Sequence, residues 1–83
     1  MPDAVDEPNF AALRHSLSRR RADRRWTYDT LAEASGVSRR TLISIETGKT
    51  RGSLESWYRI ARALEVDLGE LLRPLSRGRE PRT

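Results

Sequence analysis

The sequence contains no cysteine, and His15 is its only histidine. Disulfide bridges and thiolate metal sites are therefore excluded, and a nucleophile triad built on cysteine or histidine lacks its partners. We expect no metal and no cofactor. No other acid–base pair or nucleophile constellation stands out, which makes an enzyme the weakest class of function.

Long apolar runs are missing as well. Hydrophobic residues make up 36% of the chain, and no run approaches the roughly 20 residues that a membrane span requires. The N-terminal segment carries Asp3, Asp6 and Glu7 and lacks the basic start and apolar centre of a signal peptide. We therefore expect a soluble, cytoplasmic protein without membrane contact.

The length of 83 residues allows one small domain, because so short a chain buries only about 60% of the surface that it exposes when unfolded. Residues 1–8 are polar and acidic and include two prolines, which predicts a flexible arm. Residues 75–83 contain Gly78, Pro81 and three arginines, which predicts a flexible basic tail. The folded domain is expected over residues 9–74.

The net charge of +4 comes from 16 basic and 12 acidic side chains, and every basic one except Lys49 is arginine. GC-rich coding favours arginine whatever the function, so composition alone does not indicate a partner. Position is more informative, because the cations fall into three blocks separated by acidic stretches: residues 14–25, 39–53 and 73–83.

Apolar residues recur at spacings of three and four, which predicts helices, and no segment alternates with the period of a strand. We expect an all-α fold of five short helices over residues 10–23, 28–35, 38–47, 54–64 and from 68 to the proline at 74. Each has at its start a residue that suits an N-cap: Asn9, Thr27, Ser38, Ser53 and Asp67. Gly36 and Gly48 are predicted to end the second and third helices, and Pro74 the last.

The second and third predicted helices are separated by a turn of about three residues, so they must cross at a steep angle. The residues with suitable sizes to hold this crossing are Ala32, Gly36, Val37, Leu42 and Ile45. The N-terminal half of the third helix then faces outward. By helical spacing, its outward positions are Arg39, Arg40, Ile43, Ser44 and Thr47.

These two helices carry the pattern Trp26-Thr27-x-x-x-Leu31-Ala32-x-x-Ser35-Gly36-Val37-Ser38-x-x-Thr41-Leu42-x-x-Ile45-Glu46-x-Gly48-Lys49. A second stretch in register with it runs Ser53-Leu54-x-x-Trp57-x-x-Ile60-Ala61-x-Ala63-Leu64-x-Val66-x-Leu68-x-x-Leu71. Together they resemble the lambda repressor/Cro-like helix-turn-helix family, also called the XRE family, over residues 10–73. A bare helix-turn-helix pattern is a weak signal, whereas so many matches in register over five helices form a specific one.

The resemblance implies binding to double-stranded DNA, with helix 38–47 as the recognition helix in the major groove. By position in the family, Arg39, Arg40 and Ser44 are expected to contact bases. An arginine donates to guanine O6 and N7 together, a pairing worth about 1–3 kcal/mol of discrimination, so each half-site is expected to contain a guanine. Ile43 either contacts a thymine methyl group or packs against a neighbouring helix.

The resemblance also implies contacts to the DNA backbone. The matching positions are Thr27, Tyr28, Thr47, Lys49 and Arg51. The family commonly has glutamine where Tyr28 stands, and packing inside the domain is the alternative role for this residue. Arg21 and Glu46 match positions that often form an ion pair between the first and third helices, and this pair is expected to hold the recognition helix in place.

Three positions depart from the family pattern. Arg20 stands where an apolar residue is more common, Arg25 where glycine is frequent, and Gly52 where proline is common. These departures affect helix ends and loops more than the fold. The arginines of residues 19–25 are expected to form a solvated face, with direct DNA contact as the alternative, and Trp57 is expected to pack in the core.

The leading hypothesis is a small, sequence-specific DNA-binding transcriptional regulator. Family members usually bind inverted repeats as homodimers, with half-sites about one helical turn apart. The leucines that form either a dimer patch or part of the monomer's core are Leu68, Leu71, Leu72 and Leu75. The competing hypothesis is an antitoxin-like interaction module that binds a partner protein through its acidic and basic flanking segments.

Overall fold

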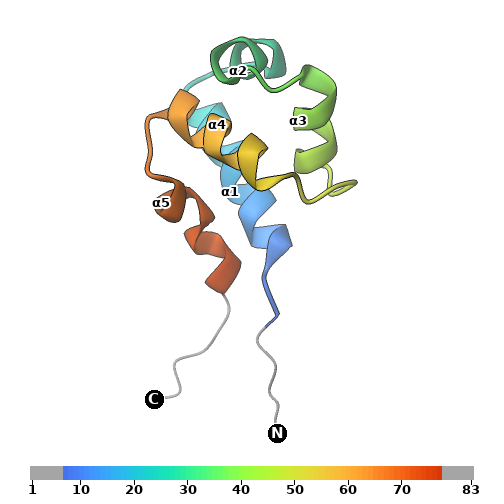
Figure 1. The fold of residues 1–83 in the computed structure, drawn as a ribbon, viewed down its shortest axis with the longest axis vertical. Coiled ribbons are helices and arrows are strands. Elements are labelled where there is room, and N and C mark those ends of the chain that lie inside the picture. Colours follow the sequence, from blue (N-terminus) through green and yellow to red (C-terminus); the bar gives the residue numbers. More distant parts are fainter. Residues whose placement is uncertain (1–6, 78–83) are drawn as a thin grey trace, which may run out of the picture.

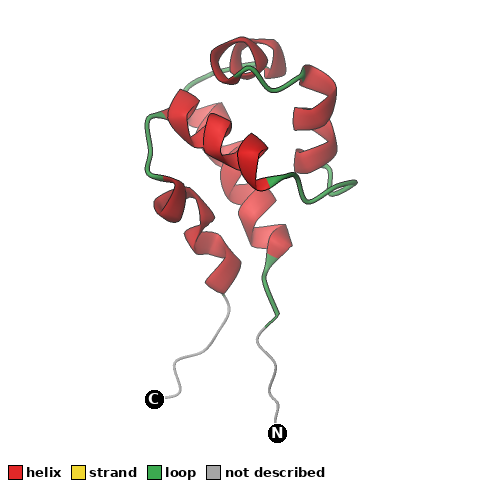
Figure 2. Ribbon diagram, viewed as in Figure 1, coloured by secondary structure: helices red, strands yellow, loops and turns green. Residues whose placement is uncertain are grey.

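The computed structural model describes residues 7–77, and its regular structure is helical (Figure 1, Figure 2). Five α-helices follow one another: α1 (Phe10–Asp23), α2 (Tyr28–Ser35), α3 (Arg39–Glu46), α4 (Leu54–Leu64) and α5 (Leu68–Leu72). A 3-10 helix, η1 (Arg73–Ser76), continues directly from α5. The described residues contain no strand, and the prediction of an all-α fold with five short helices is confirmed.

Each helix begins where the sequence offers a polar N-cap. In every case the cap side chain accepts a hydrogen bond from a first-turn backbone N–H: Ala12 to Asn9, Thr30 to Thr27, Thr41 to Ser38, Ser56 to Ser53 and Glu70 to Asp67. A cap of this kind stabilises a helix start by about 1 kcal/mol. α2 ends at Gly36, whose φ of 77° lies in the left-handed region that glycine adopts without strain.

One apolar core joins the five helices. Its members are almost completely buried: Leu13, Leu17, Leu31, Val37, Leu42, Ile45, Trp57, Ile60, Ala61, Leu64 and Leu71. α4 crosses the middle of the molecule in Figure 1 and contributes Trp57 and three further members to this core. The predicted packing role of Trp57 is thus the one observed.

The helices are arranged so that α3 keeps one face open. α2 lies at one end of the molecule, the two described chain ends lie at the other, and α3 and α5 lie on opposite sides (Figure 1). Leu42 and Ile45 direct one face of α3 into the core. The outer face of α3 is left uncovered by the described residues and is therefore a candidate surface for a partner.

The folded domain extends beyond the boundary predicted at Pro74. α5 ends at Leu72, and Pro74 is the second residue of η1, where its missing N–H is not needed. Pro74 is buried, and the Leu75 carbonyl accepts a hydrogen bond from the Asn9 N–H at 2.8 Å. Leu75 and Ser76, expected in the tail, therefore belong to η1. Most of the expected acidic arm (1–6) and basic tail (78–83) lies outside the described residues.

The C-terminal leucines pack wholly or partly against the core of the domain. Leu71 is fully buried, and Leu68, Leu72 and Leu75 are half-buried against the core. The large apolar side chains most exposed in the described part of the chain are Leu54 and Tyr58, both on α4. No described helix has the length and apolarity needed to cross a membrane.

Candidate nucleic-acid interface

The outer face of α3 brings together the side chains that helical spacing placed there. It forms a shallow groove of about 680 Å³ lined by Arg39, Arg40, Ile43, Ser44, Thr47 and Lys49. Ile43 and Ser44 are half-buried, and the other four residues are exposed. Ile43 is not among the residues that pack against the core, so it forms the apolar part of the groove. The result is a cationic rim around one apolar side chain.

Arg39 has a partner that was not predicted. Its Nε lies 3.1 Å from Oδ1 of Asp29, in the first turn of α2. The Arg39 and Asp29 side chains are 60% and 81% exposed, and such exposed pairs contribute little to stability. In this arrangement Asp29 engages Nε and leaves the two terminal nitrogens of the guanidinium for other acceptors.

Arg21 and Glu46 come together as the family resemblance implied. Nε and Nη2 of Arg21 donate to the two carboxylate oxygens of Glu46 at 2.9 and 3.1 Å. The two side chains are 18% and 4% exposed, and Nη1 of Arg21 also donates to the Trp26 carbonyl at 2.9 Å. Bidentate, charge-assisted bonds of this kind are among the strongest in proteins. They fix the end of α3 against α1.

Tyr28 joins this pair from α2. Its hydroxyl donates to Oε1 of Glu46 at 3.1 Å, and the Arg21 guanidinium lies 4.1 Å from the centre of its ring. Burial and the negative charge of Glu46 raise the pKa of Tyr28, and the hydrogen bond to Glu46 raises the pKa of Arg21. Tyr28 therefore stays neutral and packs inside the domain, the alternative role considered for it. We call Arg21, Glu46 and Tyr28 the clamp.

Two threonines predicted to contact phosphates stand at helix ends. Thr27 is the N-cap of α2, and its hydroxyl accepts from the Thr30 N–H at 3.1 Å. Thr47 is the C-cap of α3, and its hydroxyl donates to the Ile43 carbonyl at 2.7 Å. Both side chains are exposed. Thr27 thus positions the start of α2, where backbone N–H groups suit an anion, and Thr47 keeps its oxygen lone pairs at the groove.

The loop after α3 directs its two cations differently. The backbone N–H groups of Lys49 and Thr50 both donate to the Ser44 carbonyl, at 2.9 and 3.2 Å, so the loop folds back over the end of α3. This turn places the exposed Lys49 side chain at the groove. The Arg51 guanidinium instead lies over the Phe10 ring of α1, 4.5 Å from its centre.

Some arginines at the end of α1 form bonds that stabilise the fold. Arg21 belongs to the clamp, and Nη2 of Arg24 donates to the Leu64 carbonyl at 2.6 Å. The Arg24 guanidinium also lies 5.1 Å from the Trp26 ring centre. Arg19 is exposed, as a solvated face requires. This end of α1 therefore combines structural bonds with a solvated surface.

The departures from the family pattern have local explanations. Arg20 is half-buried, and its Nη2 lies 4.0 Å from a carboxylate oxygen of Glu70 on α5. Arg25 has a φ of 59°, the left-handed conformation that glycine adopts more readily. Gly52 has a φ of 84°, and a Cβ there would lie 2.9 Å from Cδ1 of Ile45. All three concern helix ends and loops, as expected.

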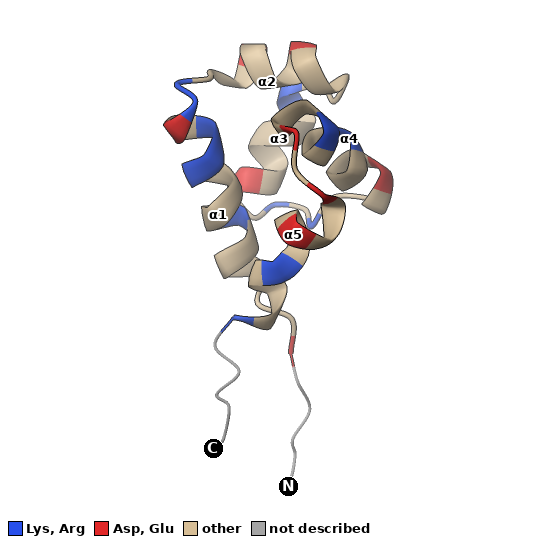
Figure 3. Ribbon diagram, turned by 90° about the vertical axis from the view of Figure 1, so that its left-hand side faces the viewer, with Lys and Arg blue, Asp and Glu red and all other residues tan. Residues whose placement is uncertain are grey.

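Charge is distributed unevenly over the domain. The groove on α3 has three cations and no carboxylate in its lining. Figure 3 shows the side of α5, where the ribbon is marked acidic in the connection before α5 and on α5 itself; the acidic residues of this stretch are Glu65, Asp67 and Glu70. Within residues 7–77, no three His, Cys, Asp or Glu side chains lie close enough to hold a metal ion. The groove suits an anionic surface with polar edges, such as a nucleic acid.

Comparison with known proteins agrees with this geometry. The helix-turn-helix family model HTH_3 matches residues 17–71, which include the clamp, the groove and both helices that form the turn. The fold is similar to that of a hypothetical transcription factor, NHTF from Neisseria, with a TM-score of 0.70, 23% sequence identity and 86% of each chain covered. A search of curated proteins finds no match. The chain belongs to the XRE-type helix-turn-helix family of DNA-binding domains.

Proposed function

We propose that the protein is a sequence-specific transcriptional regulator that reads the major groove of double-stranded DNA with α3. The observation that carries the proposal is the groove on α3, which combines three cations, two hydroxyl groups and one isoleucine. Cations match phosphates and guanine edges, and hydroxyl and methyl-bearing side chains match the other base edges. The clamp supports this role because it holds α3 in place before DNA arrives.

Four side chains are proposed to read bases. Arg40 has no ion-pair partner in the described part of the chain, so its guanidinium is available to guanine O6 and N7. Arg39 reaches the same groove in the orientation that Asp29 sets. Ser44 bonds to either a donor or an acceptor, and Ile43 contacts a thymine methyl group.

The backbone contacts are proposed to flank these base contacts. Lys49 supplies a cation, and the start of α2 at Thr27 supplies N–H groups with a partial positive charge. Thr47 adds a hydroxyl oxygen at the edge of the groove. Tyr28 contributes only its backbone N–H, because its hydroxyl belongs to the clamp. Arg51, in the observed conformation, contributes potential to the DNA backbone more than a direct contact.

The proposed assembly on DNA is a homodimer on an inverted repeat. A protein pair with two-fold symmetry requires half-sites about one helical turn, or roughly 10 base pairs, apart. Analytical ultracentrifugation of the full chain with a duplex that holds the repeat is expected to give two chains per duplex. A limit of one chain per duplex would exclude the dimer.

Selection from random duplexes, followed by binding titrations, tests the assigned roles. Arg39→Ala and Arg40→Ala are each expected to relax the preference at one base pair by about 1–3 kcal/mol. Lys49→Ala is expected to weaken binding to all sequences alike and to reduce the slope against salt by about one. Arg62→Ala, which removes an exposed arginine of α4, is the matched control and is expected to change neither property.

Two results would contradict the assigned DNA contacts. If the Arg39, Arg40 and Lys49 variants select the wild-type sequence with unchanged affinity, α3 does not read DNA. A stoichiometric protein partner, recovered together with no DNA preference, would favour the protein-interaction hypothesis. The flanking segments on which that hypothesis depends, 1–8 and 75–83, lie for the most part outside the described residues.

A further inference from the structure

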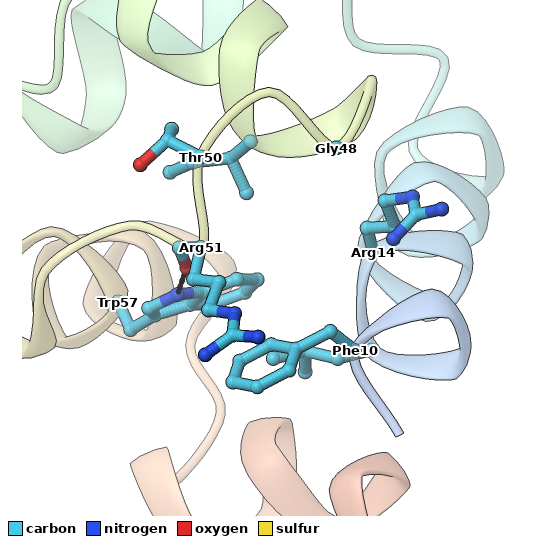
Figure 4. Close-up of a pocket in the computed structure, with 8 residues that line it drawn as sticks. Phe10, Arg14, Gly48, Thr50, Arg51 and Trp57 are labelled. Carbon is cyan, nitrogen blue, oxygen red and sulfur yellow. Dashed lines mark hydrogen bonds between the residues drawn. The ribbon is translucent and has the colours of Figure 1, made fainter. Parts of the chain in front are cut away.

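A second concave surface lies beside the α3–α4 loop, outside the groove on α3 (Figure 4). It is an open cavity of about 220 Å³ lined by residues from the first turns of α1, the end of α3, the following loop and the start of α4. Arg51 is the only one of its lining residues that belongs to the proposed DNA contacts. The cavity therefore overlaps the proposed DNA contacts only at Arg51.

The base of this cavity is apolar. Leu13, Ile45 and Trp57 line it and are only 1%, 2% and 4% exposed. The indole Nε1 of Trp57 donates to the Arg51 carbonyl at 2.8 Å, so the indole has no further donor to offer. The Phe10 ring stands at the side of the cavity (Figure 4). These three side chains expose little surface, so an occupant meets the base over a small apolar area, with the Phe10 ring beside it.

Two guanidinium groups reach the cavity from different elements. Arg51 comes from the loop and lies over Phe10, and Arg14 comes from α1 (Figure 4). Arg14 lies against Gly48, where an added Cβ would approach its Cζ to 3.1 Å. Within residues 7–77, neither guanidinium forms an ion pair. The rim of the cavity thus carries two positive charges above an apolar base.

We propose that this cavity binds a small carboxylic acid with an aromatic or branched aliphatic body. The carboxylate pairs with Arg14 and Arg51, whose planar groups suit carboxylate oxygens, and the body lies against Phe10 and reaches the small apolar base at Trp57. The volume of about 220 Å³ lies below the roughly 300–1,000 Å³ of sites for drug-sized ligands, which limits the acid to about one ring or its equivalent.

Binding of the acid is coupled to DNA binding through the loop. This step rests on the proposed function. Gly48, Thr50 and Arg51 line the cavity and follow α3 directly, with Lys49 of the DNA-facing groove between them. A bound carboxylate neutralises Arg51 and holds it against α1, which lowers the positive potential beside the DNA backbone. The acid therefore weakens DNA binding, and DNA weakens binding of the acid by the same factor.

Titration of the full-length, ¹⁵N-labelled chain with sodium benzoate tests the site without DNA. We expect saturable shifts of the Trp57 indole N–H and of the Nε–H signals of Arg14 and Arg51, and no such shifts with the neutral analogue benzamide. Arg14→Met removes one charge and keeps an apolar stem, and it is expected to weaken benzoate binding about tenfold or more. Arg62→Met, on the exposed side of α4, is the matched control and is expected to bind like the wild type.

A DNA titration then tests the coupling. Saturating benzoate is expected to lower the DNA affinity of the wild type about fivefold, and the Arg14→Met variant is expected to need about tenfold more benzoate for the same effect. An unchanged wild-type affinity would overturn the coupling. If the chain binds no DNA at all, the proposed function fails while the benzoate titration still tests the site.

Four results would overturn the site itself. The first is no saturable shift with benzoate, and the second is equal affinity for benzoate and benzamide. The third is equal benzoate affinity of Arg14→Met and the wild type. The fourth is inorganic phosphate binding as tightly as benzoate, because the apolar base would then have no part in recognition.

Discussion

Two arginines of this domain form ion pairs in opposite environments, one buried and one exposed. Arg21 on α1 is 18% exposed and forms a bidentate pair with Glu46, which is 4% exposed. Arg39 on α3 is 60% exposed and contacts Asp29, which is 81% exposed. The first pair joins two helices inside the fold. The second leaves its guanidinium accessible on the surface that we propose to face DNA.

Burial decides what each pair contributes. Removing one partner of a buried pair leaves an uncompensated charge, typically at a cost of about 3–5 kcal/mol. An exposed pair contributes about 0–1 kcal/mol, because water solvates either partner alone. The clamp is therefore expected to control stability and the groove to control DNA affinity, and variants in the two regions test whether these properties separate.

Replacing Arg21 by methionine is expected to have the largest effect on stability. The substitution keeps an apolar stem and leaves the Glu46 carboxylate buried without its cation, so the free energy of unfolding should fall by about 3 kcal/mol. Urea denaturation followed by circular dichroism measures this change. Arg39→Met is the matched control, with an expected change below about 0.5 kcal/mol. Equal losses in the two variants would remove the distinction between the regions.

Replacing Tyr28 by phenylalanine should have a smaller effect. Glu46 loses one hydrogen bond and keeps both bonds from Arg21, so the free energy of unfolding is expected to fall by about 1 kcal/mol at neutral pH. The same denaturation measurement applies. A loss as large as that of Arg21→Met would mean that the hydroxyl, and not the ion pair, is the main bond of the clamp.

The clamp should also make stability depend on alkaline pH. Burial and the charge of Glu46 raise the pKa of Tyr28 above its usual 10.0 in the folded protein. The folded state then holds the Tyr28 hydroxyl proton more tightly than the unfolded state does. The resulting contribution of Tyr28 to the free energy of unfolding is complete below pH 10 and is lost as the pH rises through the folded-state pKa. Urea denaturation at a series of pH values from neutral to above 10 measures this effect. The free energy of unfolding should fall more steeply with pH for the wild type than for Tyr28→Phe.

The exposed tyrosine provides the control for this pH dependence. Tyr58 is 52% exposed on α4, and Tyr58→Phe is expected to keep the wild-type slope. If Tyr28→Phe also keeps that slope, the pH dependence does not arise in the clamp.

The helices were predictable because their determinants are local. Caps such as Ser38 act within one turn, and apolar spacing of the kind seen from Trp57 to Leu64 fixes which face of a helix is buried. The C-terminal end was not predictable in the same way. In the sequence, Pro74 indicates the end of a helix. The helical structure nevertheless continues through η1, because Pro74 packs into the core and the Leu75 carbonyl accepts a hydrogen bond from Asn9, which is far away in the sequence.

The candidate site was predictable in part, where its residues follow from helical spacing or from the family resemblance. Helical spacing alone placed Arg40 and Ile43 on the outer face of α3, and the family resemblance implied the pair of Arg21 with Glu46. The partner of Arg39 depends on how α2 crosses α3, which spacing does not fix. The cavity at Arg14 had no signal in the sequence, because its walls come from segments that only folding brings together.

The smallest expected effect concerns Asp29. Asp29→Asn removes the carboxylate that Arg39 contacts and keeps the size of the side chain. Because both side chains are exposed, the free energy of unfolding should change by less than about 1 kcal/mol, including the loss of an acid in the first turn of α2. On DNA, two effects oppose each other: one negative charge near the phosphates is lost, and Arg39 loses its orientation.

We therefore expect Asp29→Asn to bind all duplexes more tightly and to prefer the selected sequence less strongly. Titrations of the selected duplex and a scrambled one measure both affinities. An unchanged ratio between them would show that Asp29 does not orient the base-reading arginine. A higher ratio would show that Asp29 competes with DNA for Arg39, and the exposed pair would then restrain recognition where the buried pair supports it.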